Sequence, residues 1–292
     1  MKMTTVAVTP PPVIDCHCHA GSGDGLTGPW DTDAPLNSYL QRASAAGIDR
    51  TVLFPAFNSD YTRANRALAR IVGSDPRRFI GFAFVHARND AGRVFRLVSE
   101  AVVGHGFVGL KVHRHDARIT REICEAAQAF SLPILYDVMG EVVNVELFAQ
   151  QYPRVPFIIP HLGSFADDWR AQLALIDHLE RHPNVFTDTS GVRRFDLLEQ
   201  AVERAGPEKL IFGSDGPWLH PGVELAKVHA LGLTRDEEAL ITGGNLLRLL
   251  SRVRREPRLI KPIPVSKEPT GQRETLTEEI HLPYEELEFA GD

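Results

Sequence analysis

Short apolar runs alternate with longer amphipathic stretches along most of the chain. The apolar runs are rich in Val, Ile, Leu and Phe and mostly end in Gly, Pro or polar residues, as buried parallel strands do; they cover 13–20, 51–57, 79–86, 107–113, 133–138, 156–163, 185–191 and 210–218. A helical stretch follows each run, at about 35–47, 60–73, 90–104, 120–131, 143–152, 167–182, 195–205 and 222–250. LGLT at 231–234 divides the last stretch into two helices. Eight strand–helix pairs predict an α/β fold, a (β/α)8 TIM barrel, and leave a doubly wound open sheet as the alternative.

The end of the chain breaks this alternation. Residues 252–292 carry five prolines, with six Lys/Arg and one Glu in 252–267 and eight Asp/Glu and one Arg in 268–292. We therefore predict a barrel domain over 1–251 and a Pro-rich, charged C-terminal extension over 252–292. The extension is either a loosely ordered tail or an arm that wraps this subunit or a partner through IHLPYEELEF at 280–289.

Composition narrows the class of protein. With 43% hydrophobic and 24% charged residues, the 292-residue chain has the balance of a soluble globular enzyme. A net charge of −6 argues against a general nucleic-acid binder, and three cysteines are too few for a disulfide framework. No apolar run reaches the length of a membrane span, and the opening MKMTTVAVTPPPV lacks the apolar core of a secretory signal. We expect a cytoplasmic protein with a small-molecule substrate and neither nucleic acid nor membrane as partner; a homodimer stays open.

Polar side chains gather where the predicted strands end. They are His17, His19, Lys111, His113, Asp137, His161, Asp188 and Asp215. In a barrel these ends meet at one rim, where function sits. His17 and His19 are two residues apart on a strand, so both rings share a face and can bind one divalent ion.

Cys16 and Cys18 give the first strand the look of a zinc cluster, but the same alternation argues otherwise. If the two histidines face the barrel interior, both cysteines face the helix layer as small buried apolar side chains. Cys124, in the middle of a predicted helix, has the same interpretation.

Four segments carry a family resemblance: DCHCHA on the first strand, PHLG on the sixth, FGSDGPW on the eighth and GGNLLRLL at 243–250. In this order they resemble the metal-dependent amidohydrolase superfamily, and more closely its amidohydrolase-related (amidohydrolase 2) branch, over about 13–250. That branch also includes decarboxylases of aromatic and unsaturated acids and lactone hydrolases.

The resemblance implies roles for four residues. It makes His17 and His19 ligands of a divalent ion, Zn²⁺ or alternatively Mn²⁺. It makes Asp215 a ligand that also takes a proton from the bound water, and His161 either a further ligand or the general acid/base. Such an ion polarises a carbonyl oxygen and lowers the pKa of its water from 15.7 toward roughly 7.

Two positions depart from the family or extend it. The branch usually has a metal-binding His at the end of the fifth strand, where this sequence has Asp137. Asp137 is then either an oxygen ligand or an acceptor for a ligating His. Binuclear relatives carry a carboxylated Lys on the fourth strand, but Lys111 lies deeper, which favours a buried Lys paired with Asp15 or Asp137.

The substrate is indicated only by the kinds of residue expected around the rim: Trp30, His113, Arg114, His115, Arg193, Arg194, Trp218 and His220. Aromatic rings and arginines suit a small organic acid, because an Arg fork matches a carboxylate. We predict a metal-dependent hydrolase of a C–N or C–O bond in an amide or lactone. A non-oxidative decarboxylase of the same branch is the first alternative, and a non-catalytic barrel acting as a binding protein is the second.

Overall fold

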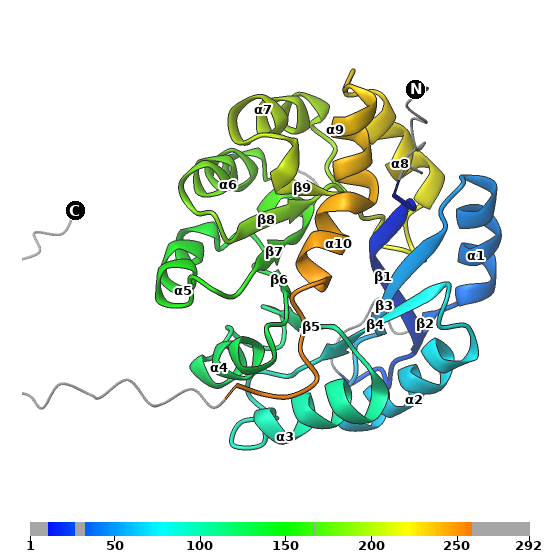
Figure 1. The fold of residues 1–292 in the computed structure, drawn as a ribbon, viewed down its shortest axis with the longest axis vertical. Coiled ribbons are helices and arrows are strands. Elements are labelled where there is room, and N and C mark those ends of the chain that lie inside the picture. The colour runs from blue at the N-terminus through cyan, green and yellow to red at the C-terminus, as the bar shows by residue number, and fades with distance from the viewer. Residues whose placement is uncertain (1–10, 27–32, 166–167, 259–292) are drawn as a thin grey trace, which may run out of the picture. The chain divides into compact units, whose positions relative to one another are not determined.

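Eight parallel strands in sequential order form the centre of the computed structural model, which describes residues 11–26, 33–165 and 168–258 (Figure 1). They are β1 (Ile14–Ser22), β3 (Arg50–Pro55), β4 (Phe79–Phe84), β5 (Gly109–His113), β6 (Ile134–Asp137), β7 (Phe157–Ile159), β8 (Val185–Asp188) and β9 (Leu210–Ile211). The short β2 (Asp33–Ala34), which the sequence pattern did not predict, pairs antiparallel with the end of β1.

Backbone hydrogen bonds close the sheet into a barrel. Cys16 N donates to Phe212 O at 3.0 Å, Gly216 N donates to His17 O at 3.1 Å, and His19 N donates to Gly216 O at 2.7 Å. These bonds join β1 to the segment that follows β9. The TIM-barrel prediction is therefore confirmed, and the open sheet is excluded because both of its edges would remain unpaired.

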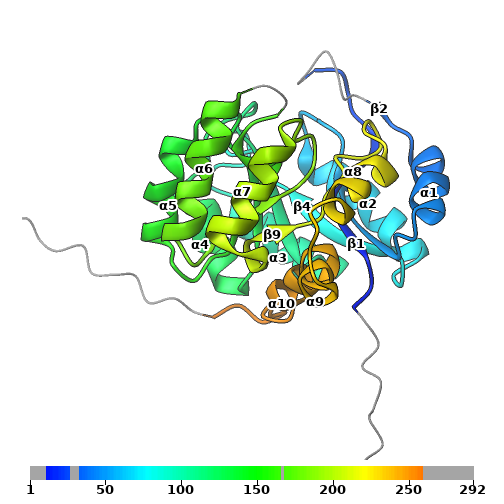
Figure 2. The same cartoon turned by 90° about the horizontal axis from the view of Figure 1, so that it is seen from above.

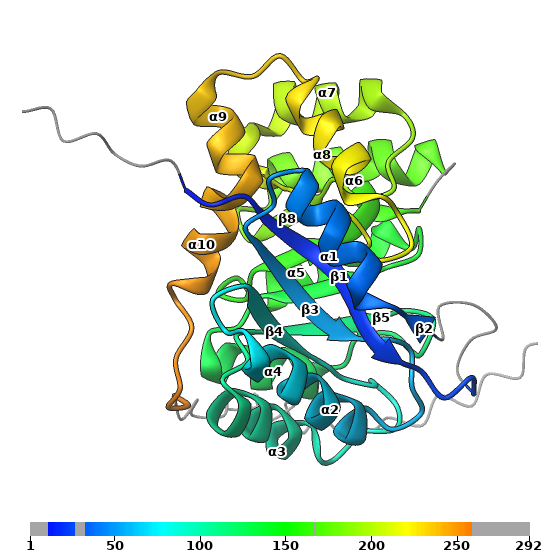
Figure 3. The ribbon, with the colours of Figure 1, turned by 90° about the vertical axis from the view of Figure 1, so that its right-hand side faces the viewer.

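Helices surround the strands (Figures 1, 2 and 3). They are α1 (Leu36–Ala45), α2 (Tyr61–Ser74), α3 (Val94–Ser99), α4 (Arg121–Phe130), α5 (Val145–Gln151), α6 (Trp169–Arg181), α7 (Phe195–Ala205), α8 (Pro221–His229), α9 (Arg235–Ala239) and α10 (Asn245–Leu250). The predicted division at 231–234 is observed, since α9 begins after Thr234, whose side chain and Glu237 form a capping box. Among the described residues, no helix has the length and apolarity needed to span a bilayer.

Two clusters of buried apolar side chains stabilise the barrel. The interior is filled largely by aromatic and branched side chains of the strands, including Phe54, Phe82, Phe84, Leu135, Ile158 and Phe186, and α10 packs Leu246 and Leu249 against this cluster. At Gly109 an added Cβ would lie 2.4 Å from the Phe82 ring, so glycine makes room for the large interior side chain. A second cluster fills the space between strands and helices.

An irregularity in β1 corrects the prediction for one cysteine. The register between β1 and β3 shifts between Asp15 and Cys18. Cys18 lies in the layer facing the helices, as predicted, but Cys16 belongs to the interior cluster together with Ile14. The bulge lets Cys16 and His17, neighbours in sequence, both serve the interior, which strict alternation forbids. Cys124 is buried on α4, as predicted.

The first residues of the predicted extension are bound to the barrel. Arg254 N donates to Phe130 O and Arg258 N donates to Ala129 O, both at 2.9 Å. The chain therefore continues along the end of α4 through Arg258, seven residues past the predicted domain boundary. The remainder of the extension, with its expected anchor at 280–289, lies outside the described residues, as does Trp30.

Candidate metal centre

Three of the predicted ligands converge at the carboxyl ends of the strands. His17 and His19 extend from β1, and Asp215 follows β9, next to β1 in the closed barrel. Oδ1 of Asp215 lies 3.3 Å from Nε2 of His17 and 3.9 Å from Nε2 of His19. One donor atom from each residue falls within 4.8 Å of the other two, an arrangement that could hold a metal ion. Asp215 reaches this position with a left-handed backbone, φ +56°.

Each histidine is oriented through its other ring nitrogen. Nδ1 of His17 lies 2.7 Å from Oδ2 of Asp188, and Nδ1 of His19 lies 3.0 Å from the carbonyl oxygen of Pro55. Carboxylate and carbonyl oxygens only accept, so Nδ1 donates in both rings and Nε2 presents its lone pair. Metal-ligating histidines are held in this way. The donor set therefore fits a divalent cation.

Electrostatics agree with neutral ligand histidines. Burial, with the positive charge of Lys111, lowers the pKa of His17 to about 3. Burial and the same lysine hold the pKa of His19 well below its usual value. Both rings are therefore uncharged at neutral pH, as metal binding requires.

Asp188 holds several residues of the site through hydrogen bonds. Its Oδ1 accepts hydrogen bonds from His161 N at 3.0 Å, Ser190 N at 3.0 Å and Ser190 Oγ at 2.6 Å. Burial opposes its ionisation, but the hydrogen bonds from His17 and Ser190 and the positive charge of His161 prevail and lower the pKa of Asp188. His17, His161 and Asp188 form a second group with donor atoms within 4.8 Å. Because both Asp188 oxygens already accept hydrogen bonds, this carboxylate serves to hold its neighbours.

Asp15 joins the two segments that carry the converging ligands. Its Oδ1 accepts from His17 N at 3.1 Å and from Ser214 N at 2.9 Å, and its Oδ2 accepts from Tyr39 Oη at 2.6 Å and from Ser214 Oγ. Burial raises the pKa of Asp15 to about 6 against the opposing effect of these hydrogen bonds. The carboxylate fixes β1 next to the residue before Asp215.

Asp137 has two histidine neighbours. Its Oδ2 lies 3.2 Å from Nε2 of His113 and 3.5 Å from Nε2 of His161, and its Oδ1 accepts from Met139 N at 2.8 Å. Burial opposes ionisation of Asp137, but both histidines hold its pKa well below the usual value. Neither group of converging donor atoms in the described chain includes Asp137. Asp137 contacts two histidines through one oxygen, and whether it is a metal ligand or an acceptor for a ligating His stays a prediction.

His161, which follows β7, faces the same carboxylate from the strand next to β6. Its Nδ1 donates to Ser190 O at 2.9 Å, and its ring lies against His17 with 5.0 Å between centroids. Burial disfavours its charged form, but the hydrogen bond to Asp137 and the charges of Asp215, Asp137 and Asp188 raise the pKa of His161 to about 9.

Lys111 is completely buried, as predicted, but its partner differs. Nζ lies 3.4 Å from Nε2 of His17 and 4.9 Å from the centre of the Phe54 ring. Within the described chain it makes no ion pair with Asp15 or Asp137; Asp137 acts on it only through its charge. Burial lowers the pKa of Lys111. The prediction that Lys111 is buried is therefore confirmed. The prediction that it pairs with Asp15 or Asp137 is wrong.

Aromatic rings surround the histidines at the rim. Trp218 lies 4.6 Å from the His19 ring, Phe57 lies 4.9 Å from the His113 ring, and Phe165 lies 5.1 Å from the His161 ring. Of these three, only Trp218 was predicted. Phe57 closes the second predicted strand run and Phe165 follows the sixth, so a search of strand ends for apolar as well as polar residues would have found both.

Two of the predicted arginines, Arg114 and Arg194, have acidic partners. Arg114 pairs with Glu141 at 2.7 Å, and Arg194 pairs with Asp196 at 2.6 Å. These pairs use some of the N–H donors of each guanidinium, so fewer donors are left for the carboxylate of an organic acid. Ser190 was missed because a lone serine after a strand carries no signal, and Asp188 was noted at its strand end but given no role.

The chain is similar to known proteins in sequence and in fold. The model of the amidohydrolase family (Amidohydro_2) matches residues 14–252. No curated protein matches significantly. Among solved structures, an amidohydrolase from Burkholderia multivorans covers 82% of this chain and 99% of its own, at 18% identity and a TM-score of 0.71.

Two further matches have named activities. A dihydroxybenzoic acid decarboxylase from Polaromonas, with bound manganese and the inhibitor 2-nitroresorcinol, covers 82% of this chain and 97% of its own at 17% identity and a TM-score of 0.63. A probable 2-pyrone-4,6-dicarboxylic acid hydrolase from Acinetobacter baumannii covers 82% and 99% at 18% identity and a TM-score of 0.62. Decarboxylases of 2,6-dihydroxybenzoate and 5-carboxyvanillate are also among the matches. At these identities the likeness shows the fold.

Proposed function

Because the chain belongs to the amidohydrolase family, we propose that it is a metal-dependent enzyme acting on a small organic acid. The observation that carries this proposal is the convergence of His17 Nε2, His19 Nε2 and Asp215 Oδ1, with both Nδ1 atoms already bound to acceptors. These three atoms would hold the ion. A divalent cation there supplies a Lewis acid that polarises a substrate oxygen and lowers the pKa of a water.

Zinc and manganese both suit the donor set. Two imidazole nitrogens and one carboxylate oxygen are ligands that zinc accepts, and oxygen donors shift preference toward manganese. The manganese in the Polaromonas relative supports testing both ions. His161 and Asp137 stand beside the three ligands rather than among them, so we assign them to the handling of protons and substrate.

Non-oxidative decarboxylation is the reaction that the comparisons favour, ahead of the hydrolysis expected from the sequence. The bond between the substrate carbon and its carboxylate breaks, carbon dioxide leaves, and the electron pair stays on the carbon. A proton must then reach that carbon. Asp215 and His161 each lie next to His17, and we assign the delivery of this proton to them.

A planar substrate suits the walls of the site. Phe57, Trp218 and Phe165 each lie against one of the site's histidines. Flat apolar faces bind an unsaturated or aromatic ring, while the polar histidines and carboxylates lie at its edge. Both dihydroxybenzoate decarboxylases among the matches act on aromatic acids, which supports this substrate class.

Hydrolysis of a lactone stays the second candidate. The Acinetobacter match supports it, and the same residues suffice. Asp215 would accept the proton of the attacking water and return it to the leaving oxygen as the carbonyl carbon–oxygen bond breaks.

One experiment separates these functions. Protein reconstituted with Zn²⁺ or Mn²⁺ is incubated with 2,6-dihydroxybenzoate, 5-carboxyvanillate and 2-pyrone-4,6-dicarboxylate, while carbon dioxide and ring opening are followed separately. Carbon dioxide release that is lost in Asp215→Asn but kept in Asp196→Asn supports decarboxylation. Ring opening without carbon dioxide supports the hydrolase. Protein that binds no metal under these conditions would overturn both, and metal-loaded protein with no turnover on any acid would favour the non-catalytic barrel.

A further inference from the structure

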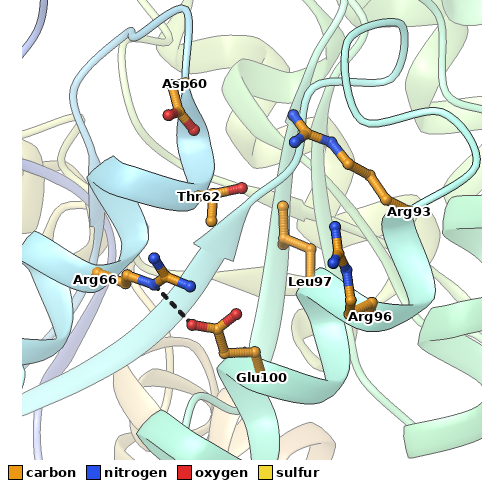
Figure 4. Close-up of a pocket in the computed structure, with 7 residues that line it drawn as sticks. All are labelled: Asp60, Thr62, Arg66, Arg93, Arg96, Leu97 and Glu100. Carbon is orange, nitrogen blue, oxygen red and sulfur yellow. Dashed lines mark hydrogen bonds and ion pairs between the residues drawn. The ribbon is translucent and has the colours of Figure 1, made fainter.

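A polar cavity, separate from the candidate metal centre, lies in the outer helix layer between α2 and α3. Its volume is about 210 Å³, and its lining residues are Asp60, Thr62, Arg66, Arg93, Arg96, Leu97 and Glu100. Figure 4 shows the guanidinium ends of Arg66, Arg93 and Arg96 directed toward the space between the helices. We propose that this cavity binds inorganic phosphate. None of its residues belongs to the candidate metal centre.

Two of the arginines are held in place by acidic partners. Arg66 Nε donates to Glu100 Oε1 at 2.8 Å, which leaves both of its terminal nitrogens for a ligand. Arg93 Nη2 donates to Asp90 Oδ1 at 2.9 Å, and Asp90 is 1% exposed, with its other oxygen accepting from His86 N. A guanidinium has five N–H donors, so one ion pair fixes it without exhausting it. Such anchoring reduces the entropy lost when a ligand binds.

Arg96 completes the set of donors. Within the described residues its side chain makes no hydrogen bond or ion pair, and its positive charge acts on Glu100. The hydroxyl of Thr62 also points into the same space (Figure 4). Guanidinium forks match the oxygen spacing of phosphate and can bind it through pairs of hydrogen bonds.

Asp60 at the opposite edge of the cavity selects among oxyanions. Asp60 is the N-cap of α2, and its Oδ1 accepts a hydrogen bond from Arg63 N. Its side chain also lines the cavity. A carboxylate repels a fully deprotonated oxyanion but accepts a hydrogen bond from a P–OH group. Phosphate keeps such a group at neutral pH and sulfate has none. The cavity should therefore bind phosphate more tightly than sulfate.

Calorimetric titration with inorganic phosphate and with sulfate, at constant ionic strength set by chloride, tests the proposal. Arg96→Ala should weaken phosphate binding about tenfold or more, and Arg96 has no protein partner whose loss would disturb folding. Arg70→Ala is the matched control, because Arg70 is an exposed arginine on α2 that does not line the cavity. Asp60→Asn keeps a helix-capping side chain and should remove the preference for phosphate over sulfate.

Each outcome of these titrations either supports or overturns the proposed phosphate site. Saturable phosphate binding that Arg96→Ala weakens and Arg70→Ala preserves supports the site. Absence of saturable binding, or equal losses in both variants, overturns it. Phosphate binding that survives Arg96→Ala unchanged places the ion elsewhere, for example on a metal at His17 and His19, and also overturns it. A sulfate affinity equal to that of phosphate in the parent protein overturns the role of Asp60.

Discussion

The imidazole of His17 and the carboxylate of Asp188 are joined by a 2.7 Å hydrogen bond in the buried interior, across 171 positions of sequence. The same carboxylate accepts the backbone N–H of His161, whose φ of +58° is left-handed. One side chain on β8 thus sets the tautomer of a candidate ligand on β1 and the backbone of a candidate acid/base after β7.

Replacing Asp188 should weaken metal binding more than it changes the fold. Asp188→Asn keeps the shape but supplies a weaker acceptor to Nδ1 of His17, so metal affinity should fall about 10–100-fold. Competition with a chelator measures this, with Asp196→Asn as the control on an exposed carboxylate. An unchanged affinity in Asp188→Asn would mean that His17 is not a ligand.

The metal content itself is a prediction. Carefully purified protein supplemented with Zn²⁺ should contain about one equivalent, because His17, His19 and Asp215 each bring one donor atom to the same place at the rim. Elemental analysis checks this, and the double variant His17→Ala/His19→Ala should contain none. Retention of a full equivalent in that variant would place the ion at another site.

Asp215→Asn should abolish turnover and leave thermal unfolding of the metal-free protein nearly unchanged. The side chain of Asp215 is 14% exposed, and Asn keeps its shape but cannot accept a proton as a carboxylate does. Initial rates and a melting curve are sufficient to test this. Activity that persists at near the parent rate would assign the proton transfer to His161 instead.

Asp137 should affect turnover more than metal affinity. Asp137→Ala removes the shared acceptor of His113 and His161, so each ring loses its contact at Nε2 while the contacts among His17, His19 and Asp215 stay. We expect kcat to fall at least tenfold, with chelator competition within about threefold of the parent. Weaker metal binding in Asp137→Ala together with stronger zinc binding in Asp137→His would instead identify Asp137 as a ligand.

The burial of Asp15 predicts a pH dependence of stability. Its folded pKa of about 6 lies above the usual value of 3.8 for an aspartate, so the folded state binds a proton more tightly than the unfolded chain. The stabilising contribution is present below pH 3.8 and is lost as pH rises through about 6. Urea unfolding of metal-free protein should show the parent losing stability relative to Asp15→Asn between pH 4 and 6. Parallel curves over that range would contradict this.

The extension should be dispensable beyond Arg258. Truncation there should leave a cooperative melt close to that of the full chain. Truncation after Ser251 removes the bonds from Arg254 and Arg258 to the end of α4 and should cost about 1–3 kcal/mol. Molten or insoluble protein after truncation at Arg258 would show that 259–292 covers an essential surface.

Sequence pattern alone was sufficient for the architecture. Apolar runs of strand length separated by helical stretches predicted every parallel strand and most helix bounds to within a few residues, because these periodicities are local properties of the chain. The His17–His19 spacing and the place of Asp215 after the last strand likewise predicted which donors meet. Barrel closure then makes the first and eighth strands neighbours in space.

Tertiary structure decided what those donors contact. The bulge between Asp15 and Cys18 placed Cys16 in the interior, although strict alternation had assigned it to the helix layer. The strand-end rule identified Asp137 and Lys111 as site residues, but their nearest side-chain partners, His113 and His17, come from other strands. Periodicity specifies the face on which a side chain lies. The stagger of strands in the closed barrel sets its height above the interior core, and that height determines which side chains touch.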